Sequence, residues 1–293
     1  MGELTQQGGS PQLIVIPGFL TEPHRLAQEH KSSALDAIDP SAYLDRRAWL
    51  KSMRCVCDES VDVTCFEWGS QSALHMLTDL ISPFIFRKES LSQGKRDFSS
   101  QISRIARELH SSWRASRDEA DRAVDQLCEL IITSPNPSSI TLVAHSLGGR
   151  IALKAIDRLY RSGERSLPKL SAWAPAISLS EMSCDSISQL TDPPEIVYSG
   201  ADLVLKYIFP LGQGPAPQMN LLGGLTILAT LMSRDQTQCA IGLIGPPKSA
   251  IELNQISQDL THLPMTHLGY LPATEAIFRS SPYLSLLLPS SLS

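Results

Sequence analysis

Residues 140–150 have the sequence ITLVAHSLGGR, and the segment 151–156, IALKAI, follows directly. The β-branched, apolar first half is typical of a strand, and the segment that follows is typical of a helix. A serine at a sharp turn from strand to helix is the geometry of a nucleophile elbow, which lifts the hydroxyl clear of the sheet and strains the serine backbone. The pattern therefore predicts that Ser146 is a nucleophile.

Small residues flank this serine, as an elbow requires. Strand and helix pass close together there, so the G-x-S-x-G pattern has a glycine on each side of the serine. Gly148 is the second of these glycines, and Ala144 replaces the first with another small residue. The alternative interpretation is an ordinary strand–helix turn in which the Ser146 side chain only caps the helix.

The composition of the 293-residue chain is that of a folded soluble protein, with 42% hydrophobic and 19% charged residues. The net charge of -5 argues against nucleic acid as the main partner, because no excess of basic residues is available to neutralise phosphates. The six cysteines lack the spacing of a zinc site, so we expect reduced thiols, no metal and no cofactor. No secretory signal is visible, and we expect a cytoplasmic location.

Apolar runs alternate with helical segments along the chain. Strands are expected at 13–16, 61–68 and 170–176, in the elbow and within 195–204, with shorter candidates at 240–245 and 251–253. Helices are expected within 24–53, at 73–80, as two helices over 98–133 with the second starting near Asp118, after the elbow, and from Thr274. This alternation predicts an α/β fold, a mostly parallel central sheet with helices on both faces. We expect a flexible N-terminus over 1–12 and a single domain over 13–293.

A serine nucleophile needs an acid and a base later in the chain, in the order Ser, Asp or Glu, His. Asp202 directly follows the apolar strand around 196–198, in the turn SGAD, and is the predicted acid. As an alternative, Asp202 only forms a turn or caps the next segment. The rival acids are Asp185 and Asp192, which have no strand before them, and Asp259, which is very close to the late histidines.

Two histidines near the end of the chain are candidates for the base. His267 lies in a loop just ahead of the expected helix from Thr274, where the final histidine of such folds is usually found, and it is the predicted base. His262, which precedes Leu263 and Pro264, is the alternative. The mechanism expected from this set is proton removal from Ser146 by His267, with Asp202 holding the histidine tautomer.

Backbone amides and apolar side chains complete the predicted site. Gly18 ends the apolar run 13–16 and lets the amide of Phe19 or Leu20 point at an oxyanion, together with the amide of Leu147. The substrate pocket is expected to include His145, Leu221, Leu222 and Leu225. The apolar segment 221–232 lies within an expected insertion around 208–235. It is interpreted as a lid or acyl-pocket helix or, with equal weight, as a buried core helix. It is too short to span a membrane.

Several of these pieces together resemble an α/β-hydrolase family typified by the transmembrane and coiled-coil domain-containing proteins. The resemblance is carried by IPGFLTE at 16–22, FEW at 66–68, Trp113 with the alanine-rich helix after it, the segment 139–151, DLVL at 202–205 and HLGY at 267–270. It covers roughly residues 13–270. The sequence differs from larger members in lacking their membrane spans, and it has AHSLG where others often have GFSLG.

The resemblance implies an α/β-hydrolase fold and a serine hydrolase, lipase-like or esterase-like, that cleaves a lipid or another acyl ester. Transient contact with a membrane surface fits such a substrate, whereas the oligomeric state stays open. The alternative from another class is an α/β-hydrolase fold that serves as a binding or interaction module. A thioesterase or acyltransferase is a variant within the first class, because the same acyl-enzyme can pass its acyl group to another acceptor.

Overall fold

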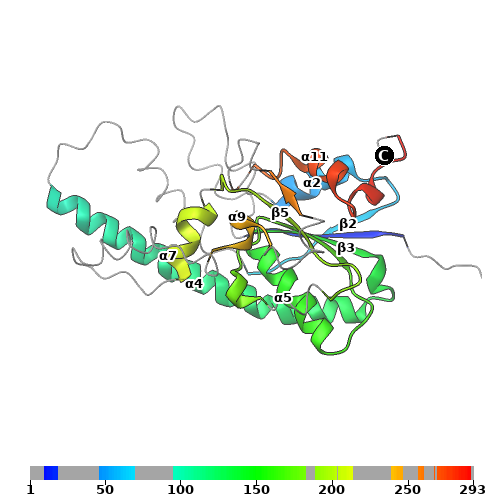
Figure 1. Cartoon of the computed structure of the whole chain (residues 1–293), viewed down its shortest axis with the longest axis horizontal. Helices are drawn as coiled ribbons and strands as arrows, with labels where there is room; N and C mark the ends of the chain where they lie inside the picture. Colours follow the sequence, from blue (N-terminus) through cyan, green and yellow to red (C-terminus); the bar gives the residue numbers. More distant parts are fainter. Residues whose placement is uncertain are drawn as a thin grey trace, which may run out of the picture.

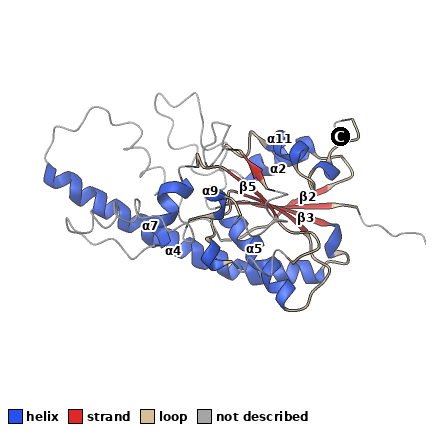
Figure 2. Cartoon of the chain, in the orientation of Figure 1, coloured by secondary structure: helices blue, strands red, loops and turns tan. Residues whose placement is uncertain are grey.

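A parallel β-sheet organises the part of the chain that the structure describes (Figure 1, Figure 2). The computed structural model describes residues 10–18, 46–69, 95–182, 189–202, 204–213, 239–246, 257–260, 267 and 269–291. Within these residues the sheet has six strands in the order β2-β1-β3-β4-β5-β6, and every neighbouring pair is parallel. The strands are β1 (Gln12–Ile16), β2 (Asp62–Cys65), β3 (Ile140–His145), β4 (Lys169–Trp173), β5 (Glu195–Tyr198) and β6 (Gln258–Asp259).

Helices lie on both sides of this sheet. In the view of Figure 1, α2 (Arg46–Val56) and α11 (Thr274–Ser280) lie on one side, and α4 (Lys95–Thr133) and α5 (Leu147–Arg161) lie on the other. The predicted α/β class with a mostly parallel sheet is thereby confirmed. The remaining helical elements are α7 (Phe209–Gln213), α9 (Ile241–Ile244) and the short turns η1 (Pro137–Ser139), η2 (Leu179–Glu181), η3 (Val204–Ile208) and η5 (Ser285–Leu287).

The direction of the chain through the sheet reverses between β1 and β3. From β1 the chain moves to one edge to form β2, then returns past β1 to form β3 and continues toward the other edge. In open α/β sheets, ligands bind outside the carboxyl ends of the strands at such a reversal. Gly18 follows β1 and Ser146 follows β3 at this end of the sheet, so the topology alone places both at the usual ligand site.

Burial explains why the central strands are continuously apolar in sequence. All six residues of β3 are buried, and so are the last four of β1. Strands of a parallel sheet that is covered on both faces need apolar side chains on both faces, which removes the alternation seen in half-exposed strands. The run 13–16 is therefore an inner strand and not an edge strand.

The long helix α4 differs from the prediction of two helices. It continues without a break over 39 residues, because the sequence 98–133 contains no glycine or proline that would end a helix. The acidic cluster near Asp118 thus lies inside the helix instead of at the start of a second one. On the face of α4 that packs on the rest of the protein, Leu127 is fully buried, whereas Leu130 is 37% exposed.

Residues 240–245 are also not the strand that their apolar run suggests. Residues 241–244 form the short helix α9, and Ala240 makes only an isolated antiparallel bridge with Ser178. Short apolar runs do not distinguish a strand from a buried helical turn, which is the reason for the error. The sheet instead gains its last strand from the polar pair at β6, which no apolar pattern indicates.

A partly buried ionic network around Arg150 joins the helix after the elbow to α4. Arg150 is completely buried and binds Asp121 of α4 through two nitrogens, Nε at 2.9 Å and Nη2 at 3.1 Å. Its third nitrogen donates to Glu181 at 2.8 Å. Lys154 also binds Asp121, and Arg117 also binds Glu181, each at 2.8 Å. The network therefore connects α4 and η2 to α5, the helix that begins at the elbow.

A second buried polar group, Glu195, joins the last strands to the C-terminal segment. Its carboxylate accepts hydrogen bonds from Ser171 of β4 and Ser281 after α11, both at 2.6 Å, and from the side-chain amide of Gln258 in β6. A buried carboxylate with three donors is satisfied, so this cluster positions β4, β6 and the end of the chain relative to one another.

Several expectations lie outside the described residues: the helical segments before residue 46 and at 73–80, the strand candidate 251–253, and the apolar segment 221–232. In the part of the chain that is described, no helix combines the length and the apolar character needed to cross a membrane.

Candidate active site

Ser146 lies at a strained turn between β3 and α5. Its φ is 55° and its ψ is -120°, a backbone conformation that residues other than glycine rarely adopt. The main chain holds it there: the Ser146 N–H donates to Trp173 at 2.9 Å, and its carbonyl accepts from Ala176 at 2.9 Å. The Ser146 side chain makes no capping hydrogen bond to α5, so the interpretation as a simple helix cap does not hold.

Close packing around the turn explains the small residues in its sequence. A Cβ atom on Gly148 would lie 2.1 Å from the carbonyl oxygen of Ile16, so α5 can approach β1 only with glycine there. A Cβ on Gly18 would lie 2.6 Å from the Cβ of Ser146, which puts the segment after β1 directly beside the serine. The Trp68 indole N–H donates to the Pro17 carbonyl at 2.9 Å and supports that segment.

The structure brings Ser146, His267 and Asp202 into one hydrogen-bonded chain. His267 Nε2 lies 2.8 Å from Ser146 Oγ, and His267 Nδ1 lies 2.8 Å from Asp202 Oδ2. Because a carboxylate only accepts, the proton of the neutral imidazole lies on Nδ1, and Nε2 is left to accept from the serine hydroxyl. All three side chains are buried, and the serine and histidine are 121 positions apart in the sequence. The arrangement can move a proton from the hydroxyl to the imidazole next to a fixed negative charge.

Asp202 combines the two roles that the sequence left as alternatives. Its Oδ2 accepts from His267, while its Oδ1 accepts from the Leu205 N–H at 3.0 Å and so caps the start of η3. The carboxylate is fully buried, and these two donors compensate for its lost hydration. The cap orients the carboxylate that faces the imidazole.

His145 is buried and contacts both His267 and Trp49. Its Nε2 lies 2.9 Å from the main-chain oxygen of His267, and its ring centre lies 4.7 Å from that of His267 and 5.0 Å from that of Trp49. Burial lowers the pKa of His145 well below its usual value, and the neighbouring charge of His267 lowers it further, against the opposing effect of the hydrogen bond to the His267 backbone. That His145 lines a substrate pocket stays a prediction.

Tyr270 is a buried polar residue that no catalytic pattern in the sequence indicates. Its ring centre lies 5.6 Å from that of His145, and its hydroxyl has no hydrogen-bond partner among the described residues. Burial raises the pKa of the Tyr270 hydroxyl well above its usual value, and the negative charges of Asp202 and Asp259 raise it further. Its only signal in the sequence was its place in HLGY at 267–270.

The other predicted site residues are placed as follows. Leu147 is the first residue of α5, so its N–H has no carbonyl partner within the helix. The rival acid Asp259 belongs to β6. Phe19, Leu20, Leu221, Leu222, Leu225, Asp185 and His262 lie outside the described residues.

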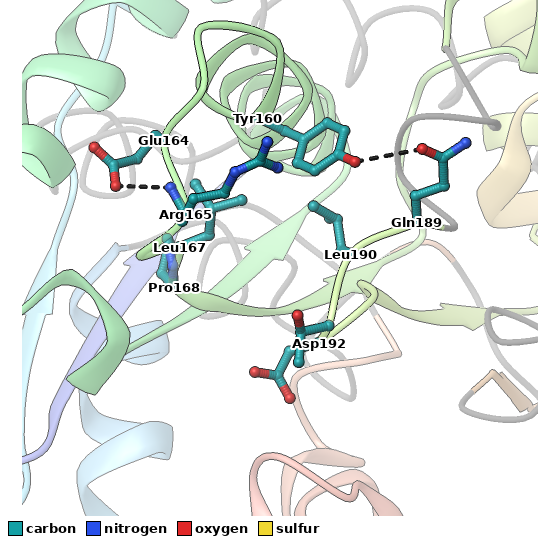
Figure 3. Close-up of a pocket in the computed structure, with 9 residues that line it drawn as sticks. Tyr160, Glu164, Arg165, Leu167, Pro168, Gln189, Leu190 and Asp192 are labelled. Atoms are coloured by element: carbon teal, nitrogen blue, oxygen red, sulfur yellow. Dashed lines mark hydrogen bonds between the residues drawn. The ribbon is translucent and has the colours of Figure 1, made fainter.

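A shallow pocket at the opposite end of the sheet is separate from this site. It is lined by the end of α5, by the loop between α5 and β4, and by the segment before β5, which includes the rival acid Asp192 (Figure 3). The Arg165 guanidinium lies over the Tyr160 ring there, 5.4 Å from its centre. Because α5 begins at the elbow and is about 22 Å long, a pocket at its far end cannot contribute groups to Ser146.

Comparison of the chain with protein-family models, with curated proteins and with solved structures gives no match. Among the described residues, no group of three or more histidine, cysteine, aspartate or glutamate side chains is placed to hold a metal ion.

Proposed function

We propose that this chain has an α/β-hydrolase fold and is a serine hydrolase. The observation that carries the proposal is the continuous hydrogen-bonded chain from Ser146 Oγ through the His267 ring to Asp202, with 2.8 Å at both links. Its support is the strained serine at the end of β3, with the acid and the base after later strands in the chain order typical of this fold. A surface serine near a histidine by chance would not have all of these features.

Within this class, we propose a carboxylic ester hydrolase that acts on a lipid or another acyl ester. Several sequence segments resemble the α/β-hydrolase family typified by the transmembrane and coiled-coil domain-containing proteins. That resemblance implies a lipase-like or esterase-like activity and supports this choice of substrate. The same acyl-enzyme would also serve a thioesterase, so the two are separated by the substrate assay below.

The reaction begins with attack of Ser146 Oγ on the ester carbonyl carbon while the hydroxyl proton passes to His267 Nε2. The carbonyl oxygen becomes an oxyanion, which the Leu147 N–H and an amide after Gly18, from Phe19 or Leu20, would stabilise. The ester C–O bond then breaks, and the leaving alcohol takes the proton from Nε2. Water attacks the acyl-enzyme by the same steps, releasing the carboxylic acid and restoring the serine hydroxyl. Asp202 stabilises the imidazolium in both halves.

The test is hydrolysis of p-nitrophenyl esters and of thioesters with matched short and long acyl chains, with labelling by a fluorophosphonate probe. Wild type should hydrolyse at least one ester and react with the probe, and Ser146→Ala should abolish both. Ser138→Ala, at an exposed serine before β3, is the matched control and should behave like wild type. If folded wild type and Ser146→Ala are equally inactive on every oxygen ester and thioester and unreactive toward the probe, the hydrolase proposal fails and a binding module becomes the better account.

A further inference from the structure

His145 joins two segments that meet at Ser146. From the end of β3, its Nε2 reaches the His267 main-chain oxygen at 2.9 Å. On its other side, a Cβ built on Gly18 would lie 3.0 Å from Nδ1, so that nitrogen faces the segment after β1. One buried ring therefore spans from the candidate base to the candidate oxyanion segment.

The hydrogen bond from His145 has a defined direction. A carbonyl oxygen can only accept, so His145 Nε2 carries the proton and donates. The ring is 4% exposed and packs between Trp49 of α2 and Tyr270. A buried donor in a packed aromatic cluster has little freedom to turn, so the acceptor it binds is held in place.

We propose that His145 is a positioning residue for the base: its Nε2–H, bound to the His267 carbonyl, holds the His267 ring in line with Ser146 Oγ. The contact acts on the main chain of His267 itself, at the residue whose ring nitrogens make both links of the catalytic chain. His145 touches neither Ser146 Oγ nor Asp202 through any hydrogen bond that the described residues show.

The neutral state of His145 suits this role. During turnover the His267 ring becomes a cation, with its centre 4.7 Å from that of His145. A second cation there would oppose proton transfer to His267, because like charges disfavour each other's protonated forms in a buried site. Burial and the proximity of His267 lower the pKa of His145, so the ring donates its hydrogen bond without carrying charge.

Two substitutions separate the hydrogen bond from the shape of the side chain. His145→Phe keeps an aromatic ring between Trp49 and Tyr270 but has no donor. His145→Gln has a side-chain amide nitrogen at a similar distance from the main chain and restores a donor without the ring. Displacement of a catalytic group by about 1 Å can cost roughly 100-fold, so we expect kcat of His145→Phe to fall roughly 10–100-fold with KM nearly unchanged. His145→Gln should recover most of that loss.

A second measurement does not depend on activity. The His267 Nδ1 proton bonded to Asp202 should give a resolved downfield proton NMR signal in wild type. That signal should broaden or move in His145→Phe and return in His145→Gln. Trp49→Phe is the packing control, because it loosens the same cluster but leaves the donor in place, and its signal and kcat should stay near those of wild type. His145→Leu replaces the phenylalanine variant if that one does not fold.

The measurements of kcat and KM rest on the proposed hydrolase function, whereas the proton NMR measurement does not. Absence of ester hydrolysis and probe labelling in wild type, with the NMR changes as expected, would reject the hydrolase and retain the positioning role. The positioning proposal is overturned if the donor-free variants keep the wild-type signal. It is also overturned if His145→Gln is impaired as much as His145→Phe, or if Trp49→Phe at matched stability loses as much kcat.

Discussion

The Asp202→Asn substitution tests the proposed acid most directly, because each of the two carboxylate oxygens accepts from a different donor. Leu205 N–H donates to Oδ1 at 3.0 Å, and His267 Nδ1 donates to Oδ2 at 2.8 Å. Asparagine has one acceptor oxygen and one amide nitrogen, so it cannot accept from both. Its size and shape otherwise match those of aspartate, so the fold should be kept.

Either orientation of the asparagine damages the site. If its oxygen stays on the Leu205 N–H, its amide donates to His267 Nδ1, the ring proton moves to Nε2, and the ring can no longer accept from Ser146. If the amide is flipped, two donors face each other at Leu205 and a buried N–H is left unsatisfied, which costs about 1–3 kcal/mol. The first orientation should dominate. Loss of the correct tautomer and of the carboxylate charge lowers kcat by about 10⁴ in a comparable triad, equivalent to about 5 kcal/mol in the barrier.

The assay is kcat on the best p-nitrophenyl ester and the rate of fluorophosphonate labelling, with thermal unfolding to check the fold. Asp192→Asn, at the rival acid in the distant pocket, is the matched control and should retain wild-type rates. A kcat for Asp202→Asn within tenfold of wild type would refute the assignment of Asp202 as the acid.

Three further predictions concern stability, each measured by urea unfolding. Gly148→Ala should destabilise the protein by about 3 kcal/mol or more, because the added Cβ meets main chain at 2.1 Å and overpacking a core costs about 1–3 kcal/mol even where side chains can move; a loss below 0.5 kcal/mol would contradict the packing at the elbow. Arg150→Met should cost on the order of 2–3 kcal/mol, less than the 3–5 kcal/mol of a fully buried pair because Asp121 is 36% exposed and keeps another cation; it is wrong if unfolding is unchanged. Burial raises the pKa of Glu195 from 4.5, against the hydrogen bonds from its three partners. A raised folded pKa contributes stability that is complete below about pH 4.5 and is lost as the pH rises through the folded value. Glu195→Gln should therefore remove part of the fall in stability above pH 4.5, and an identical pH profile in both proteins would contradict this account.

Helices, strands and turns whose conformation depends on neighbouring residues could be predicted from the sequence. The elbow appears as expected, with β3 ending at His145 and α5 starting at Leu147, and α11 begins at the predicted Thr274. The α/β class follows from the alternation of apolar runs and helices. One prediction went wrong because two outcomes share a local pattern: the apolar run at 240–245 contains a helical turn at 241–244 and not a strand. The other error was the division of 98–133 into two helices, although no glycine or proline interrupts that span.

Contacts between residues far apart in the sequence could not be predicted from local sequence patterns. Nothing in the pattern around Arg150 shows that its guanidinium binds carboxylates on α4 and η2, since those contacts depend on how α5 lies beside α4. The same holds for Glu195, whose three donors come from three separate segments.

By itself, the sequence determined the strand–turn–helix around Ser146, because steric limits at a tight turn act within a few residues and demand small side chains there. The order of residues along the chain also reduced the candidates for the acid and the base that act with Ser146 to a few aspartates and two histidines. Only the tertiary structure decided that the His267 ring meets both the Asp202 carboxylate and the Ser146 hydroxyl, across separations of 65 and 121 positions. Such contacts depend on strand order and on loop paths across the sheet, which no local pattern encodes.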